Sequence, residues 1–351
     1  MTRFQTIVLG ASGYVGGECL RLVHGHPELT LEAAVSESKA GTAVSSLFPH
    51  LGSSVDARFR APKEIPSILE GAEGTVAVLS AASHGASASL IAELLAAAEE
   101  KGADVRVVDL SADFRYRDAS SYEAVYKNPH GAPSILPLFD CGVPEHLAVT
   151  PRHAGHPGCF ATSVLLGVVP LLKLGIVESE IFVAGITGST GSGREPKETT
   201  HHPERHSNLF AYQPLVHRHV PEMTDLAEKA SGLRPKIHFV PHSGPFARGI
   251  HTTIQGKLRA PLDAEAIRSE LARFYAGSPL VRVVPGTPRV KDVAASSFAH
   301  LGVAADGETV AVFSVIDNLL KGAAGGGVQW LNRMLGLPES MGLTQPAPGW
   351  I

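Results

Sequence analysis

The sequence predicts two domains, a doubly wound α/β domain with a parallel sheet and an α+β domain with a mixed sheet. Over the first third of the chain, short apolar runs alternate with helical patterns, which is typical of βαβ units and a sheet covered on both faces. Further along, several strand-like runs surround a single clear helix. The length of 351 residues exceeds what one hydrophobic core usually serves.

In the first third, short apolar runs predict strands, and longer segments with apolar residues at helical spacing predict helices. The predicted strands are Thr6–Leu9, Leu31–Val35, Thr75–Leu79 and Val105–Leu110, and the predicted helices are Val15–His24 and Ala86–Lys101. Because strands and helices alternate here, we expect neighbouring strands to run parallel.

The middle of the chain, residues 111 to 160, is rich in proline and is expected to form loops. An apolar helix from about Ala161 to Leu174 follows, with Gly175 in the position of a C-terminal cap. The remaining predictions are strands at Ile181–Ile186, Ile237–Pro241, Ile250–Lys257, Val281–Val284 and Val310–Ile316, and helices at Leu262–Tyr275 and near Gly327–Leu335.

The composition argues against several classes of protein. A net charge of −4 gives no general attraction to nucleic acid or anionic membranes, and 44% hydrophobic with 18% charged residues is typical of a folded domain. Three cysteines are too few for a disulfide framework. The most apolar stretch is interrupted by Pro170 and Lys173, and the start MTRFQTIVLG lacks signal-peptide anatomy. We therefore expect a cytoplasmic protein.

A glycine-rich turn follows the first predicted strand and leads into the first predicted helix. Glycine suits a tight turn and lets the backbone approach a pyrophosphate, which the N–H groups of the following helix can then bind. The GxxGxxG spacing favours dinucleotide binding over a plain strand-to-helix turn. The expected cofactor contacts are Gly10, Ser12, Gly13, Tyr14, Val15 and Gly16.

The residues after the second strand bear on the type of dinucleotide. A carboxylate at this position favours a free ribose 2′-hydroxyl, whereas hydroxyls and a cation favour a 2′-phosphate. Ser36, Ser38 and Lys39 indicate NADP, while Glu37 points the other way. A polar surface turn without cofactor contact is the alternative.

Cys159 lies where a Pro/Gly turn meets a helix, in the run Gly155–Thr162. The partial positive charge of a helix N-terminus stabilises a thiolate, so this setting suits a nucleophile. The alternative is a buried structural cysteine. That alternative fits Cys19, which lies inside the first helix, whereas Cys141 lies in a loop and could be either.

A nucleophilic thiol needs a proton partner, and the tightest polar cluster is His217-Arg218-His219. If this stretch is extended, both histidines point to the same side and one could act as general acid/base. A zinc site is the alternative, because further histidines lie close in sequence: His201, His202 and His206. Neither paired cysteines nor an HExxH pattern supports it, so we expect no metal.

Three polar segments follow predicted strands, where open α/β sheets bind ligands. Arg115, after Val105–Leu110, could bind a phosphate or carboxylate, or form a surface ion pair with Asp113 or Asp118. A second glycine-rich turn, Gly188–Arg194, could shape an anion site or be a mobile loop. Ser83 also lies just past a strand end.

Taken together, these residues resemble the N-acetyl-γ-glutamyl-phosphate reductases, relatives of aspartate-semialdehyde dehydrogenase. The resemblance runs nearly end to end and rests on many separate blocks in the same order. These blocks are Gly10–Glu18, Leu110–Arg115, Gly142–Glu145, Pro157–Thr162, Gly188–Arg194, His217–Glu222, Arg248–Ile250 and Ile316–Gly325.

The resemblance implies NADPH-dependent reduction of an acyl phosphate to an aldehyde in arginine biosynthesis. Cys159 would attack the acyl carbon, phosphate would leave, and hydride would reduce the resulting thioester. His217 is chosen over His219 as the acid/base, and Arg115 and Arg248 are the expected substrate ligands.

The resemblance also implies further cofactor contacts and the domain organisation. The additional contacts are Ser83, Gly188, Ser189, Gly191, Gly193 and Asn318. A Rossmann-type domain would comprise residues 1–157 and 318–351, and a catalytic and dimerisation domain residues 158–317. A homodimer or homotetramer is expected.

One segment departs from this pattern. The run His201–Arg205 is similar to lysine-branch relatives, whose substrate is attached to a small acidic carrier protein. The alternative function is therefore reduction of a carrier-linked γ-glutamyl or aminoadipyl phosphate. Such an enzyme would need a basic groove, for which Lys197, Arg205 and Arg218 are the candidates, although a solvated charged loop would look the same.

Overall fold

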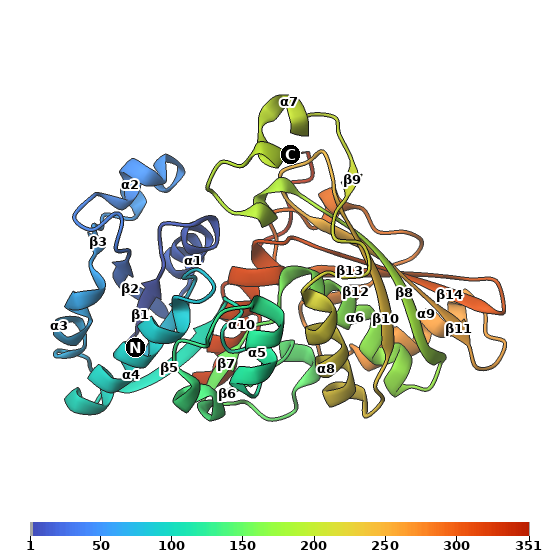
Figure 1. The fold of residues 1–351 in the computed structure, drawn as a ribbon, viewed down its shortest axis with the longest axis horizontal. Coiled ribbons are helices and arrows are strands. Elements are labelled where there is room, and N and C mark those ends of the chain that lie inside the picture. Colours follow the sequence, from blue (N-terminus) through green and yellow to red (C-terminus); the bar gives the residue numbers. More distant parts are fainter. Residues whose placement is uncertain (1–2, 351) are drawn as a thin grey trace. The chain divides into compact units, whose positions relative to one another are not determined.

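The structure, a computed structural model, describes residues 3–350 and divides into two compact units, each built on a seven-stranded sheet (Figure 1). The first unit contains the chain up to Gly142, Val149–His156 and Ala323–Leu343, and the second contains Val143–Ala148, Pro157–Gly322 and the chain from Thr344. These bounds differ from the expected domains at residues 143–148, at residue 157, at residues 318–322 and after residue 343. Residues 143–148 join the second unit because Glu145 pairs there with Lys321 and the His146 ring hydrogen-bonds to Tyr275.

The sheet of the first unit has the order β3-β2-β1-β4-β5-β7-β6, and all its strand pairs are parallel. The strands are β1 (Phe4–Leu9), β2 (Leu29–Val35), β3 (Phe59–Arg60), β4 (Thr75–Ser80), β5 (Asp104–Asp109), β6 (Phe139–Cys141) and β7 (His153–Gly155). The predicted parallel sheet is confirmed.

Helices cover both faces of this sheet. The helices of this unit are α1 (Tyr14–Gly25), α2 (Val44–Leu47), α3 (Ile65–Leu69), α4 (Ser87–Lys101), α5 (Ala119–Tyr126) and α10 (Gly325–Met334), and of these α1, α4 and α10 pack against the strands. Successive residues of β4 point to opposite faces: Val78 packs in one core cluster with Ile91 of α4, whereas Leu79 lies against Gly327 of α10. This two-sided burial explains the nearly continuous apolar sequence of the central strands.

The sheet of the second unit is mixed, as predicted, with the order β12-β13-β14-β11-β8-β10-β9. The β8–β10 and β12–β13 pairs are parallel and the other pairs are antiparallel. The strands are β8 (Val177–Thr187), β9 (Phe210–Ala211), β10 (Lys236–Ser243), β11 (Ile250–Leu258), β12 (Val281–Val283), β13 (Ala299–Ala305) and β14 (Thr309–Ile316).

The helices of the second unit are α6 (Cys159–Lys173), α7 (His202–Arg205), α8 (His219–Ser231) and α9 (Ala264–Phe274). α6, α8 and α9 pack on the sheet, and along β11 buried residues alternate with more exposed ones. Ile254 of β11 touches Gly167 of α6 so closely that a Cβ at Gly167 would lie 2.4 Å from its Cδ1. Among residues 3–350 no helix is long and apolar enough to span a bilayer.

We expect the contribution of His153 to the stability of the first unit to fall as the pH drops from 6.5 to about 4. Burial lowers the pKa of His153 from 6.5 to about 4, and its Nδ1 accepts a hydrogen bond from the N–H of Val107. Within this window the imidazole binds a proton in the unfolded chain but not in the folded chain, so this one residue makes the free energy of unfolding rise with pH, by about 3 kcal/mol in total.

Urea denaturation across this pH window, with wild type and His153→Gln, tests this expectation. Glutamine offers an oxygen acceptor without titrating. The slope of the free energy of unfolding against pH should therefore correspond to about one bound proton less in the variant than in wild type. Asp109 acts in the opposite sense, because burial and the nearby Asp113 raise its pKa to about 6. The comparison with the variant removes that contribution, and identical slopes would contradict the role of His153.

Candidate active site

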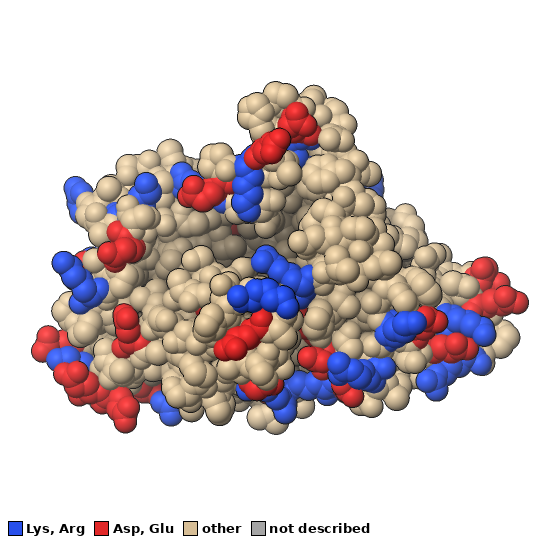
Figure 2. All heavy atoms as spheres, in the orientation of Figure 1, with Lys and Arg blue, Asp and Glu red and all other residues tan. Residues whose placement is uncertain are grey.

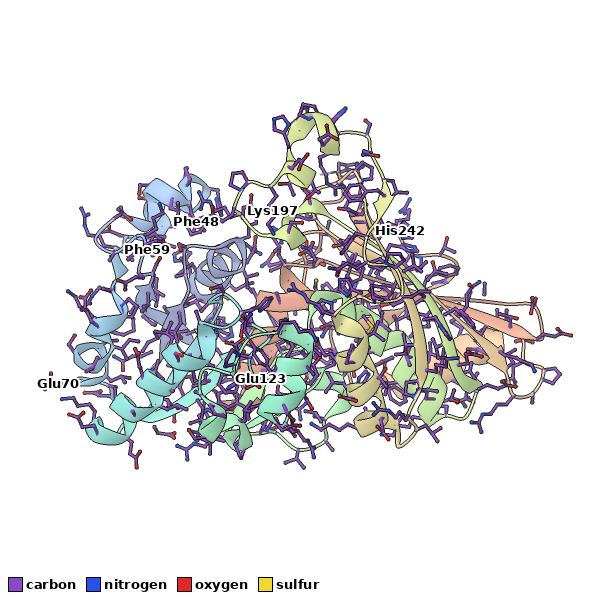
Figure 3. All side chains as sticks on the ribbon, viewed as in Figure 1. Phe48, Phe59, Glu70, Glu123, Lys197 and His242 are labelled. Atoms are coloured by element: carbon purple, nitrogen blue, oxygen red, sulfur yellow. The ribbon has the colours of Figure 1, made fainter. Side chains whose placement is uncertain are left out.

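A cavity of about 390 Å³ in the second unit brings together the predicted nucleophile and both predicted histidines. Its wall includes Cys159, His217 and His219. The loop between β8 and α7, on which Figure 3 labels Lys197, forms another part of the wall. These residues lie far apart in sequence, and only the fold makes them neighbours.

Cys159 is the first residue of α6, and it is partly exposed. The helix N-terminus stabilises negative charge there, which favours the thiolate. Cys19 and Cys141 are both buried in the first unit, and burial raises the pKa of the Cys19 thiol. Of the three thiols, the one at the predicted position therefore combines access with a helix N-terminus.

The backbone around Cys159 is closely supported. The N–H of Gly158, which caps α6, donates to Oε1 of Glu222 at 2.7 Å. On another side, a Cβ at Gly322 would lie 2.8 Å from Cβ of Cys159. The buried Glu222 belongs to α8, so one carboxylate connects the start of the cysteine helix with the first turn of the histidine helix.

The His217-Arg218-His219 segment is not extended. An extended stretch was the condition under which both histidines were expected on the same side. Arg218 has helical dihedral angles and His219 is the first residue of α8. The two histidines still meet, because both are buried and their ring centroids lie 4.7 Å apart. Pro221 in the first turn is the local signal for this helix start.

His217 is held neutral near physiological pH. Burial and the neighbouring Arg218 lower the pKa of His217 to about 4. Its Nδ1 accepts a hydrogen bond from the backbone N–H of His219 at 3.2 Å. The hydrogen bond assigns the proton of the neutral ring to Nε2, so His217 can donate a hydrogen bond from that atom.

The second glycine-rich turn reaches the cavity through Gly191. Gly188 packs directly on the backbone of Ala247, where a Cβ would lie 2.4 Å from the carbonyl oxygen. Asn318 braces this region, since its Nδ2 donates to Oγ1 of Thr190 and its Oδ1 accepts from the N–H of Gly249. Gly188, Ser189, Gly193 and Asn318 thus lie in or next to one turn, and their cofactor contacts stay predictions.

The two arginines predicted to bind substrate are engaged with protein groups. Arg248 forms two hydrogen bonds with Asp317, from Nε at 2.9 Å and from Nη2 at 3.1 Å. Arg115 lies buried in the first unit and donates to the carbonyl oxygens of His156 and Leu110. Arg248 is thus paired with a carboxylate and Arg115 with backbone carbonyls, and the substrate role of these arginines stays a prediction.

In the first unit, the predicted phosphate loop connects β1 and α1. Gly10 has φ +65° and lies so close to Ala82, next to Ser83, that a Cβ would approach within 2.4 Å of its backbone. Gly13 caps α1 and a Cβ there would meet no atom within 4 Å, so the helix N-terminus is open. Ser36 donates to the hydroxyl of Ser12 at 2.9 Å and joins the end of β2 to this loop.

The residues of this turn are therefore placed to bind a phosphate, because an open helix N-terminus with a glycine backbone receives anions. Tyr14 and Val15 form the first turn of α1, and Ser38 and Lys39 are exposed after β2.

The five histidines considered as an alternative zinc site do not form one cluster. His201, His202 and His206 are exposed on and around α7, whereas His217 and His219 are buried at the cavity. In the part of the chain that the structure describes, no group of three or more His, Cys, Asp or Glu side chains is placed to hold a metal ion.

Comparisons with known proteins agree with this organisation. Residues 5–147 match the family model "Semialdehyde dehydrogenase, NAD binding domain", and residues 159–318 match "Semialdehyde dehydrogenase, dimerisation domain". Among solved structures, aspartate semialdehyde dehydrogenase II from Vibrio cholerae superposes with a TM-score of 0.70 at 18% identity, covering 95% of this chain and 99% of that one. The fold is therefore that of the semialdehyde dehydrogenases.

Curated relatives are similar over almost their whole length. The N-acetyl-γ-glutamyl-phosphate reductase of Geobacter sulfurreducens is 39% identical over 348 residues, covering 97% of each chain. That of Methanosarcina mazei is 37% identical over 350 residues, covering 99% of this chain and 98% of the relative. With both halves matched by semialdehyde dehydrogenase models, the resemblance read from the sequence is confirmed, and the chain belongs to the N-acetyl-γ-glutamyl-phosphate reductase family of oxidoreductases.

Proposed function

We propose that this enzyme uses NADPH to reduce N-acetyl-γ-glutamyl phosphate to N-acetylglutamate semialdehyde, with release of phosphate. The relatives' names supply the substrate. The observation that carries the chemistry is the position of Cys159, at the start of α6 in a cavity that also contains two histidines. A thiolate in this position is a suitable nucleophile for an activated acyl carbon.

The cofactor assignment rests on the first unit. The open helix N-terminus at Gly13 and the close packing at Gly10 fit a pyrophosphate, and Ser36, Ser38 and Lys39 fit a 2′-phosphate. When bound, NADPH supplies the hydride. A solved aspartate semialdehyde dehydrogenase from Candida albicans with NADP has the same fold, with a TM-score of 0.66 at 16% identity over 95% of this chain and 99% of that chain.

The residues of the second unit account for the remaining steps. The Cys159 sulfur forms a bond to the acyl carbon, and the bond from that carbon to the phosphate oxygen breaks, leaving a thioester. After hydride arrives at this carbon, a histidine gives a proton to the oxygen of the thiohemiacetal. Loss of that proton and cleavage of the carbon–sulfur bond release the aldehyde and restore the thiolate.

His219 is the better proposal for the proton transfer. His217 was preferred from the sequence, but its Nδ1 is occupied by the N–H of His219 and its pKa lies at about 4. A neutral ring with its proton on Nε2 stabilises a developing oxyanion as a hydrogen-bond donor, whereas a general acid must exchange protons near the working pH.

We therefore expect His219→Asn to lower kcat by on the order of a hundredfold or more. His217→Ala should lower kcat less, because it removes a hydrogen-bond donor and leaves the proposed proton-transfer residue in place. Steady-state kinetics measure both effects. The reverse pattern would return the acid/base role to His217.

A carrier-linked substrate is the second candidate. Of the three cations predicted for such a groove, Arg205 is buried and donates to the carbonyl oxygen of Gly244, which leaves Lys197 and Arg218 at the cavity. In Figure 2, basic and acidic side chains are interspersed on the displayed face. These observations favour the free N-acetylated substrate.

The test is NADP-linked oxidation of N-acetylglutamate semialdehyde in the presence of phosphate, compared with the carrier-linked semialdehyde. The proposal requires a kcat/KM for the free substrate that exceeds that for the carrier-linked one. A preference for the carrier-linked compound would reassign the enzyme to the alternative, and no activity with either would remove the proposed reaction.

We also propose a homodimer or homotetramer that pairs through the sheet face opposite α6. Phe182 is 51% exposed on β8 and stacks on His238 of β10, with ring centroids 4.7 Å apart.

We expect Phe182→Asp to lower the oligomeric mass measured by light scattering, because burial of a charge at the centre of an interface is costly. Leu209→Asp is the matched control, since Leu209 is 52% exposed on a loop outside the sheet. Equal masses for all three proteins would contradict this interface.

A further inference from the structure

The cavity beside Cys159 has one sign of charge. Its charged wall residues other than histidine are Lys197 and Arg218, and no aspartate or glutamate of the described chain forms part of its wall. Hydroxyl groups of Thr187, Ser192, Tyr212 and Ser243 also line it. A cavity with cations, hydroxyl donors and no carboxylate is suited to an anion.

We propose that Lys197 and Arg218 form a subsite that binds an oxyanion of the substrate beside the nucleophile. The identity of that substrate rests on the proposed function. Two groups of an acyl phosphate of this type have the required chemistry, the phosphoryl group and the carboxylate. Both are oxyanions, and the experiments below separate them.

Lys197 reaches the cavity from the loop between β8 and α7 (Figure 3). Its Nζ donates to the carbonyl oxygen of Ser192 at 3.1 Å. This bond orients the ammonium group and uses one of its three N–H donors, so the group can also bind an oxyanion. Both residues belong to the cavity wall, and the contact therefore holds the charge at the site.

Arg218 lines the same cavity from the start of α8, where it is the N-cap residue. Its side chain is exposed while His217 and His219, on either side, are buried. Burial and then the charge of Arg218 lower the pKa of His217. Burial and then the charge of Cys159 raise the pKa of Tyr212, and the charge of Arg218 opposes that rise. Arg218, Tyr212 and Cys159 thus lie within electrostatic range of one another along one wall.

The two arginines predicted from the sequence as substrate ligands, Arg115 and Arg248, lie outside the wall of this cavity. Arg248 is paired with the buried Asp317, and Arg115 donates to backbone carbonyls of the first unit. Neither contributes to the cavity wall. The two cations that line the cavity with Cys159 stabilise negative charge on a leaving phosphate or bind the carboxylate, and in both cases they also favour the thiolate.

The first experiment measures the charge of the cavity without any substrate. Iodoacetate is an anion and iodoacetamide is neutral, so the ratio of their rates of Cys159 alkylation reports the local charge, read by mass spectrometry of the Cys159 peptide. We expect Lys197→Gln and Arg218→Gln each to lower this ratio by on the order of threefold to tenfold. Lys257→Gln, on β11 and outside the cavity wall, is the control and should keep the wild-type ratio. Inorganic phosphate should slow alkylation by iodoacetate in wild type and less so in the two cavity variants.

The second experiment identifies the bound group in the oxidative direction, with NADP, semialdehyde and phosphate. A rise in the KM for phosphate in both cavity variants assigns the subsite to the phosphoryl group, and a rise in the KM for the semialdehyde assigns it to the carboxylate. Unchanged alkylation ratios together with unchanged KM values would overturn the subsite. If the wild-type enzyme oxidises neither the free nor the carrier-linked semialdehyde, but the two cavity variants still have lowered alkylation ratios, the subsite is retained and the proposed function is lost.

Discussion

Cys159→Ser is expected to lower kcat by at least about a thousandfold, the largest effect on activity that the structure predicts. Serine has a similar size, but its hydroxyl is not ionised at neutral pH and attacks an acyl carbon poorly without a strong base. The helix N-terminus that favours a thiolate cannot compensate for this difference. Steady-state kinetics in both directions measure the loss.

NADPH affinity separates loss of chemistry from loss of folding. The proposed cofactor contacts of the glycine loop lie in the first unit, whereas Cys159 lies in the second, so the Kd of Cys159→Ser for NADPH should stay within about twofold of wild type. Cys141→Ala is the matched control for removal of a thiol, because Cys141 is buried in the first unit, and it should retain turnover. Full activity in Cys159→Ser would exclude the thioester pathway.

The largest expected effect on stability is that of Lys321→Met. Lys321 and Glu145 are both fully buried side chains, and Nζ lies 2.5 Å from Oε1. Removal of the cation leaves a carboxylate in an apolar interior, which typically costs about 3–5 kcal/mol. We therefore expect a reduced urea midpoint, followed by circular dichroism.

A double variant tests the cause of that loss. Lys321→Met combined with Glu145→Leu removes both charges and should recover most of the stability, because an apolar pair of similar volume is often tolerated. Arg268→Met breaks the exposed pair with Glu265 and should cost less than about 1 kcal/mol. A single Lys321→Met variant as stable as the Arg268 control would contradict the importance of the buried pair.

The fold was largely predictable because its signals are local. The alternating strands and helices of the first unit, its glycine-rich turn and the Cys159 turn each lie within a short stretch of sequence. The expectation that both histidines meet was tied to an extended stretch, whereas His219 begins α8, a start for which Pro221 in the first turn is the local signal. Strand β13, Ala299–Ala305, was missed, because its alanines and glycine carry little strand propensity.

The site was less predictable because its contacts are not local. Glu222 lies 64 residues from Gly158, whose N–H it accepts, and Lys321 lies 176 residues from Glu145. No spacing rule connects residues so far apart. Arg115 and Arg248 were singled out for their charge, but the sequence could not indicate that Asp317 and backbone carbonyls occupy their guanidinium groups.

The bond between Glu222 and Gly158 has a consequence for the reaction cycle. One end of this carboxylate's helix carries the imidazoles, and its oxygen holds the peptide group that precedes the sulfur. The spacing between the attacking atom and the proton source is therefore set by a direct hydrogen bond between the start of α6 and the first turn of α8, in addition to the packing of the two helices.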